Sequence, residues 1–174
     1  MDQQFIINTK PLSGLFLYFY TMRKPLLTLA LILCCITGSF AQQNATDAVK
    51  QTISRLFDGM RKGDSTVLRS VFSKDMILQS ISTGKDGKAT LSIEKASDFV
   101  KAIGTPHQQV YDERIVFGDI KIDGDLASVW APYQFYLGDK FSHCGVDVFS
   151  LLKTAEGWKI IYIVDTRRKD NCIQ

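Results

Sequence analysis

Histidine is scarce in this sequence, and its positive and negative charges nearly balance. The two histidines, His107 and His143, fall on different predicted elements and lack the spacing of metal ligands, so we expect no metal site. Lysine and arginine together number 21 against 18 aspartates and glutamates, so no basic face is indicated and we expect no nucleic-acid partner. No phosphate-cradling glycine loop, GxSxG motif or Cys–His nucleophile pair is evident, and we expect no cofactor.

Long hydrophobic runs are also missing. The uncharged run Leu26–Ile36 has eleven residues, whereas a helix that spans a membrane needs about 20. It follows the basic start Met22–Pro25 and precedes the small residues Ser39 and Ala41, which is the plan of a secretory signal peptide. We expect cleavage after Ala41, a secreted, periplasmic protein, and no stable membrane span after cleavage.

The signal peptide divides the chain into three parts. We interpret residues 1–21 as an extension upstream of the true start at Met22, residues 22–41 as the signal peptide, and residues 44–174 as a single domain. Cleavage leaves 133 residues with 18 basic and 17 acidic side chains, enough for one hydrophobic core. Leu33 is too large to precede a lipidated Cys34, so a lipid anchor is the weaker reading.

Two cysteines, Cys144 and Cys172, remain after this cleavage. In an oxidising compartment an even pair can form a disulfide, and we predict one that ties the C-terminal tail over the sheet. The alternative is a small buried thiol at Cys144 and a free thiol in the tail at Cys172.

A pair of helices is predicted at the start of the domain. The first begins at Thr46 as its N-cap and ends at Gly63, and Asp64 caps a second, shorter helix. Apolar residues at helical spacing mark the buried side of the first helix. They are Val49, Ile53, Leu56, Phe57 and Met60.

A small hairpin and a third helix follow. Asp86 and Gly87 mark the hairpin turn between strands over residues 76–83 and 89–93, and the third helix covers residues 94–103. The rest of the chain reads as strands joined by tight turns, which are antiparallel neighbours. These strands cover residues 111–122 (with an irregularity at Gly118), 126–137, 141–153 and 158–166. Helices on one side of an antiparallel sheet make an α+β domain.

The order of these elements resembles the nuclear transport factor 2-like superfamily, which includes SnoaL-like polyketide cyclases and ketosteroid isomerases. More specifically, the chain resembles secreted bacterial proteins described as lumazine-binding-like, through the runs VWAPY (129–133), SHCGVD (142–147) and DTRR (165–168). The resemblance implies a strongly bent antiparallel sheet that wraps around the N-terminal helices like a cone. It also implies a mostly apolar small-molecule pocket in the open end of that cone.

The strand pair 126–137 and 141–153 supplies the candidate site. A two-residue turn at Gly138-Asp139 predicts that Asp147 lies opposite Trp130 and that His143 lies opposite Gln134. These four side chains would then share one face, which suits an aromatic or heterocyclic ligand. The other face, with Tyr133 and Cys144, is almost wholly apolar and could equally be the core, and a one-residue slip would exchange the partners.

The last strand adds Asp165 and Arg167 to the candidate ligand-binding residues. Asp165 could hydrogen-bond Trp130 or a ligand, and Arg167 together with Arg168 could clamp an anion. The alternative for all three is a solvated strand end. His143 could likewise be a sheet histidine with its hydrogen bonds satisfied, and Asp147 could pair with Arg167 or Arg168.

Three functions remain open at this level. The leading hypothesis is a binding domain for a small aromatic or heterocyclic molecule, without catalysis. The second is an isomerase, cyclase or dehydratase of the type found in the superfamily, with Asp147 or His143 as general base and Tyr133 or Tyr136 as hydroxyl donor. The predicted register places Tyr133 on the face opposite Asp147, which weakens that pair. The third is a non-catalytic homodimeric module.

Overall fold

The computed structural model describes residues 42–172. The expected upstream extension, residues 1–21, and the expected signal peptide, residues 22–41, lie outside the described residues. Within the described part of the chain, no helix is both long enough and apolar enough to cross a membrane.

The N-terminal helix covers residues 42–62 of the described chain. It is already helical before Thr46, so the predicted N-cap at Thr46 is wrong, and no glycine or proline among residues 42–45 interrupts the helix. Gly63, at a φ of 66°, ends this helix in the left-handed region that favours glycine. Asp64 caps α2 (Ser65–Val71), as predicted, and its carboxylate accepts hydrogen bonds from the Thr66 and Val67 amides at 2.9 and 3.1 Å.

The hairpin and the third helix form close to the predicted positions. Strand β1 (Phe72–Thr83) starts directly after α2 and pairs with β2 (Ala89–Lys95), and α3 (Ala96–Gly104) follows. The long strand predicted over residues 111–122 is broken around Gly118 into β3 (Tyr111–Ile115) and β4 (Ile120–Asp123). Across the break, the amides of Val116 and Gly118 still donate to carbonyl oxygens of the next strand.

Seven strands form one sheet in the order β2-β1-β7-β6-β5-β3, and β4 also pairs with β5. Neighbouring strands are antiparallel, except that β1 and β7 run parallel. The five strands of the second half are β3 (Tyr111–Ile115), β4 (Ile120–Asp123), β5 (Leu126–Leu137), β6 (Lys140–Thr154) and β7 (Gly157–Arg167).

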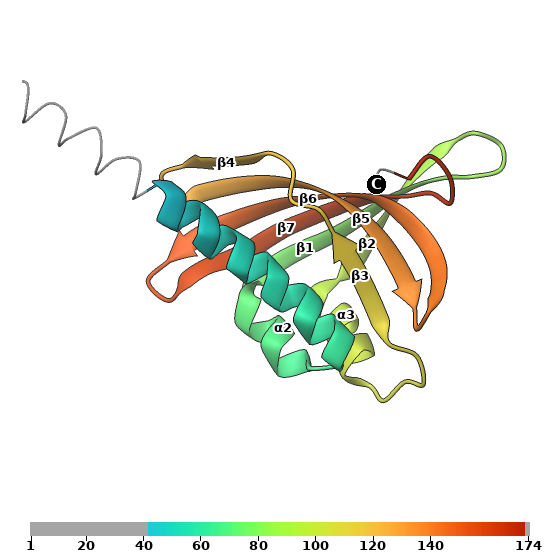
Figure 1. The fold of residues 1–174 in the computed structure, drawn as a ribbon, viewed down its shortest axis with the longest axis horizontal. Coiled ribbons are helices and arrows are strands. Elements are labelled where there is room, and N and C mark those ends of the chain that lie inside the picture. The colour runs from blue at the N-terminus through green and yellow to red at the C-terminus, as the bar shows by residue number, and fades with distance from the viewer. Residues whose placement is uncertain (1–41, 173–174) are drawn as a thin grey trace, which may run out of the picture. The chain divides into compact units, whose positions relative to one another are not determined.

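The sheet is curved and unclosed, and the N-terminal helix runs across its concave side (Figure 1). The helix buries its predicted apolar stripe there against inward residues of β5, β6 and β7. Removal of this apolar surface from water is the main stabilising contribution to such a core. The inward residues are Ala127, Val129, Ala131, Phe149, Leu151, Ile160 and Ile163.

A bulge in β6 overturns the predicted register between β5 and β6. Tyr136 pairs with Phe141, but the next pair is Phe135 with His143, so Ser142 is an extra residue in β6. Beyond the bulge, Asp147 faces Ala131 rather than Trp130, and His143 no longer faces Gln134. Because adjacent residues of a strand point to opposite sides, this single insertion moves Trp130 and Gln134 to the face opposite His143 and Asp147.

A disulfide joins Cys144 to Cys172, with Cα atoms 5.8 Å apart. Cys144 lies on the outer face of β6 beside Arg168, with which it exchanges two backbone hydrogen bonds. The bond ties residues 169–172 back over the outer face of the sheet.

We predict that this disulfide is present in the protein isolated from an oxidising compartment. The intact mass after reduction and thiol labelling should then show two labelled cysteines in residues 42–174, and unreduced protein should show none. Labelling of Cys172 without reductant would contradict the prediction. A Cys172→Ser variant provides the control, since its Cys144 should label only after unfolding.

Candidate functional site

A cavity lies at the end of the concave side, where the apolar core gives way to polar side chains. We call it the inner cavity; its volume is about 60 Å³, enough for several water-sized atoms. The N-terminal helix, β1 and α3, with one residue each from β6 and β7, form its apolar wall, and polar groups from β3, β5, β6 and β7 form the opposite side. The apolar wall includes Leu56, Phe57, Met60, Leu78, Phe99, Phe149 and Ile163, and the polar side consists of Glu113, Tyr133, His143, Asp147, Asp165 and Arg167.

A larger outer cavity of about 350 Å³ adjoins the inner one. The two share lining residues from the N-terminal helix, α3, β3, β6 and β7, so together they form one continuous pocket. The shared residues are Met60, Phe99, Glu113, His143 and Arg167. An inner polar end with an outer apolar vestibule is a common arrangement for a small-molecule site.

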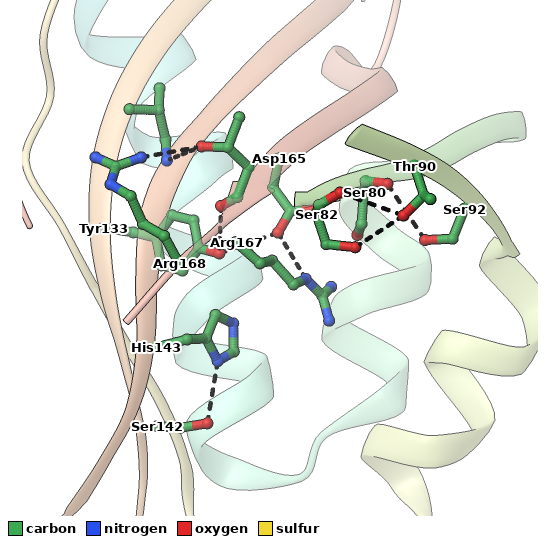
Figure 2. Close-up of polar contacts among 12 residues, drawn as sticks. Ser80, Ser82, Thr90, Ser92, Tyr133, Ser142, His143, Asp165, Arg167 and Arg168 are labelled. Carbon is green, nitrogen blue, oxygen red and sulfur yellow. Dashed lines mark hydrogen bonds and ion pairs between the residues drawn. The ribbon is translucent and has the colours of Figure 1, made fainter. Parts of the chain in front are cut away.

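Asp165 is the centre of one hydrogen-bonded group in the pocket (Figure 2). Its Oδ2 accepts from the Arg167 Nε at 2.8 Å and lies 3.0 Å from the Tyr133 hydroxyl. That hydroxyl also lies 2.9 Å from the carbonyl oxygen of Thr166, and it can donate to either acceptor. Asp165 is only 8% exposed, so these contacts replace the water that a buried carboxylate loses.

Glu113 and Asp147 form a second group, a pair of carboxyls that interact directly. Burial and the neighbouring Glu113 raise the pKa of Asp147 well above its usual range. Burial also raises the pKa of Glu113, to about 7. Ionising both of two neighbouring carboxyls in a cavity costs electrostatic free energy, because the two negative charges repel each other. The pair therefore retains a proton near neutral pH. Asp147 is 4% exposed, and apart from the hydrogen bond between the two carboxyls its Oδ2 has no hydrogen-bond partner among the described residues.

Gly145 allows Tyr133 to reach Asp165. It pairs with Tyr133 across β5 and β6, and the Tyr133 ring packs directly over it. A Cβ atom on residue 145 would lie 2.8 Å from Cε1 of Tyr133 and 1.7 Å from the carbonyl oxygen of Thr166. Only glycine permits this close approach of β6, β7 and the tyrosine ring.

His143 lines both cavities but is not oriented by Asp147. Its Nδ1 lies 3.0 Å from the Ser142 hydroxyl, and its ring contacts the rings of Tyr133 and Phe135. Four residues of β-strand separate His143 from Asp147, a rise of about 13 Å, which is too far for a hydrogen bond. Burial and the nearby Arg167 lower the pKa of His143, so the ring is neutral at neutral pH.

Two predicted ligand-binding residues, Trp130 and Gln134, do not line the pocket. Trp130 lies on the outer face and is 51% exposed, and Gln134 accepts a hydrogen bond from Tyr136 there. The predicted hydrogen bond between Asp165 and Trp130 is therefore wrong. Arg167 and Arg168 cannot act as one clamp either, because they point to opposite faces, and Asp147 pairs with neither.

Glu113 was missed at the level of sequence, although a signal for it existed. Within β3 it alternates with Tyr111 and Ile115, which places a carboxylate on the apolar side of that strand. Tyr133 was assigned to the wrong face through the same register error. The structure thus brings together four predicted residues, His143, Asp147, Asp165 and Arg167, and adds these two.

No group of three or more His, Cys, Asp or Glu side chains within residues 42–172 is arranged to hold a metal ion. The three neighbouring carboxyls of Glu113, Asp147 and Asp165 are likewise not arranged to hold a metal ion. These carboxyls are engaged with each other, with Tyr133 and with Arg167 rather than directed at one point.

Comparison with known proteins gives one family match. A family model described as "Putative lumazine-binding" matches residues 44–164, and no curated protein matches the chain. Among solved structures, a nuclear transport factor 2-like protein of unknown function from Shewanella baltica aligns with a TM-score of 0.56 at 21% identity, over 75% of this chain and 98% of that one. A protein with a cystatin-like fold from Novosphingobium aromaticivorans aligns with a TM-score of 0.57 at 10% identity, over 76% and 87%. At such sequence identities the solved structures support only the assignment of the fold.

Proposed function

The chain belongs to the lumazine-binding-like family of nuclear transport factor 2-like proteins, and we propose that it binds a small aromatic or heterocyclic molecule in the open end of its curved sheet. We further propose that it does so as a secreted, periplasmic protein after cleavage at Ala41. The observation that supports binding most directly is the buried, unpaired Oδ2 of Asp147 in the inner cavity. A buried acceptor without a partner costs free energy that a ligand donor would recover.

The composition of the pocket supports an aromatic ligand. Three phenylalanines, Phe57, Phe99 and Phe149, stand on the apolar side, and their ring faces and edges favour flat aromatic partners. The few polar groups opposite them can fix the orientation of a ring that carries nitrogen or oxygen atoms.

A thermal-shift screen of heterocycles, with lumazine included, tests this function. A ligand at 100 times its Kd stabilises the folded state by about 2.7 kcal/mol, which raises Tm by several degrees in a domain of this size. Arg167→Ala should weaken binding of a hit that carries no positive charge, because it removes the arginine that lines both cavities. Arg168→Ala is the matched control, since it removes the same charge one residue away on the opposite face, and it should leave binding unchanged. Equal effects of the two variants would contradict the proposed site.

Catalysis is a second candidate, favoured by one observation. Tyr133 and Asp147 line the same cavity, so a buried carboxyl of raised pKa faces a hydroxyl donor, as isomerases and dehydratases of the superfamily type require. An assay of enol or ketone isomerisation with wild type, Asp147→Asn and His143→Ala tests the assignment. Turnover that survives both substitutions eliminates these two residues as the general base.

Homodimer formation is a third candidate, through the outer face of the sheet. One cross-strand row there runs from Ile93 through Gln79, Val164 and Val148 to Trp130, and its two ends are 70% and 51% exposed. A row that is apolar except for Gln79, with exposed apolar residues at both ends, is typical of an interaction surface. Light scattering at micromolar concentration should give the mass of two chains, and Trp130→Ser should shift it to one.

A further inference from the structure

The pocket contains more acidic than basic side chains. The titratable groups of the inner cavity come from four strands: Glu113 from β3, Tyr133 from β5, His143 and Asp147 from β6, and Asp165 and Arg167 from β7. The outer cavity adds Glu94 from β2 and Tyr111 from β3. The other residues that line the inner cavity carry no charge. Three carboxyls thus face a single permanent cation, Arg167, since burial keeps the His143 ring neutral.

The single arginine is already engaged. Arg167 forms its ion pair with Asp165 at 2.8 Å, and Tyr133 completes the surroundings of that carboxylate. Among residues 42–172, Glu113 and Asp147 form no ion pair with a cation, and the charge of Arg167 only partly offsets the rise in their pKa values. Buried acids are normally paired with a cation, so this pair has the chemistry of a cation site whose positive partner comes from outside the protein.

We propose that the inner cavity binds an organic cation, an amidinium or ammonium group attached to an aromatic or heterocyclic body, between Glu113 and Asp147. This inference rests on the proposed binding function and names the class of ligand. The cationic group donates to the unpaired Oδ2 of Asp147 and to the Glu113 carboxylate, and charge-assisted hydrogen bonds of this type are the stronger ones.

The shape and lining of the pocket fit such a ligand. The inner cavity, at about 60 Å³, accepts a compact head group, and the adjoining outer cavity, at about 350 Å³, accepts a ring system. The phenylalanine rings of the apolar wall add cation–π attraction, which grows when the cation is desolvated. Because no metal-type cluster is found within residues 42–172, the site fits an organic cation better than a metal ion.

Binding of a cation displaces the proton that Glu113 retains. Free Glu113 keeps this proton up to about pH 7, whereas the complex needs the Glu113 carboxylate ionised. One proton released per ligand makes the affinity increase with pH, by roughly 20-fold between about pH 5.5 and 7.5, and level off above that.

Three probes of the same size separate charge from shape: benzamidine (cationic), benzamide (neutral) and benzoate (anionic). Binding to the secreted form, residues 42–174, is measured by isothermal titration calorimetry and by NMR shifts at about pH 5.5, 6.5 and 7.5. We expect benzamidine to bind about tenfold or more tightly than benzamide, and we expect the affinity for benzamidine to rise with pH. Benzoate should not bind. Glu113→Gln should remove the pH dependence and weaken benzamidine, whereas Asp123→Asn, an exposed carboxylate outside the pocket, should change neither.

Two results overturn the proposal. If benzamide binds as tightly as benzamidine, or if the affinity for benzamidine is constant with pH, the head group is not recognised as a cation. The proposed binding function would still stand in that case if a heterocycle binds wild type and loses affinity in Arg167→Ala. If no probe and no heterocycle binds at any pH, both the cation class and the binding function are wrong.

Discussion

Gly145→Ala is expected to destabilise the protein by about 3 kcal/mol or more, one of the two largest effects we predict. The new methyl group would lie 1.7 Å from the carbonyl oxygen of Thr166 and 2.8 Å from the Tyr133 ring. Backbone atoms cannot move aside as a flexible side chain can, so β6 and β7 must separate at this point. Urea unfolding, followed by tryptophan fluorescence, measures the loss in the free energy of unfolding.

Gly124→Ala is the matched control for this change. Gly124 has a φ of 57°, and a Cβ atom there meets nothing within 4 Å, so alanine costs only the backbone strain of the left-handed region, about 1 kcal/mol. Equal losses for the two variants would show that the close approach at Gly145 is not what limits the substitution. Gly145→Ala should also displace Tyr133, so its residual folded fraction should bind ligand less well than Gly124→Ala does.

Glu113→Gln is expected to stabilise the protein at alkaline pH by about 2 kcal/mol relative to wild type. Burial raises the pKa of Glu113 from 4.5 to about 7 in the folded state. Between these values the folded chain binds more protons than the unfolded chain, so the stabilisation is complete below about pH 4.5 and is lost as the pH rises through 7. Wild type should therefore lose stability between pH 5 and 8, and the glutamine variant should lose less.

The comparison between variants is needed because other groups titrate in the same range. The lowered pKa of His143 acts in the opposite direction, since a histidine that is kept neutral in the fold gains stability as the pH rises. This contribution is common to wild type and Glu113→Gln, so the difference between their urea midpoints isolates the carboxyl pair. Asp123→Asn provides a control for a general loss of negative charge. A wild-type stability that rises from pH 5 to 8 in parallel with the variant would contradict the raised pKa.

Local patterns in the chain predict most of its secondary structure correctly. The stripe from Val49 to Met60 repeats at helical spacing, and those residues do form the helix side of the core. Asp64 caps α2 because a short side chain ahead of an apolar stripe can satisfy two amides, and this depends on neighbours only. The resemblance of the element order to nuclear transport factor 2-like proteins then predicts the strong bend of the sheet, but not the parallel pairing of β1 with β7.

The candidate site was only half predictable. His143, Asp147, Asp165 and Arg167 stand out as polar residues in apolar strands, and all four line the pocket. Trp130 and Gln134 have the same local character, but one inserted residue in β6, Ser142, reverses their face relative to these four. A turn motif sets the register only next to the turn, and the bulge at Ser142 changes it along the rest of the strand.

The sequence by itself determined the helices, the strands and the family of this protein, because these follow from spacing and from capping residues near one another in the chain. Only the tertiary structure decided which face each strand turns inward, that the one available arginine pairs with Asp165, and that Glu113 and Asp147 meet across the cavity. Those facts depend on contacts between strands far apart in sequence, where a shift of one residue changes every partner. They also decide the chemistry, because the pKa of a carboxyl depends on burial and on the charges next to it in space.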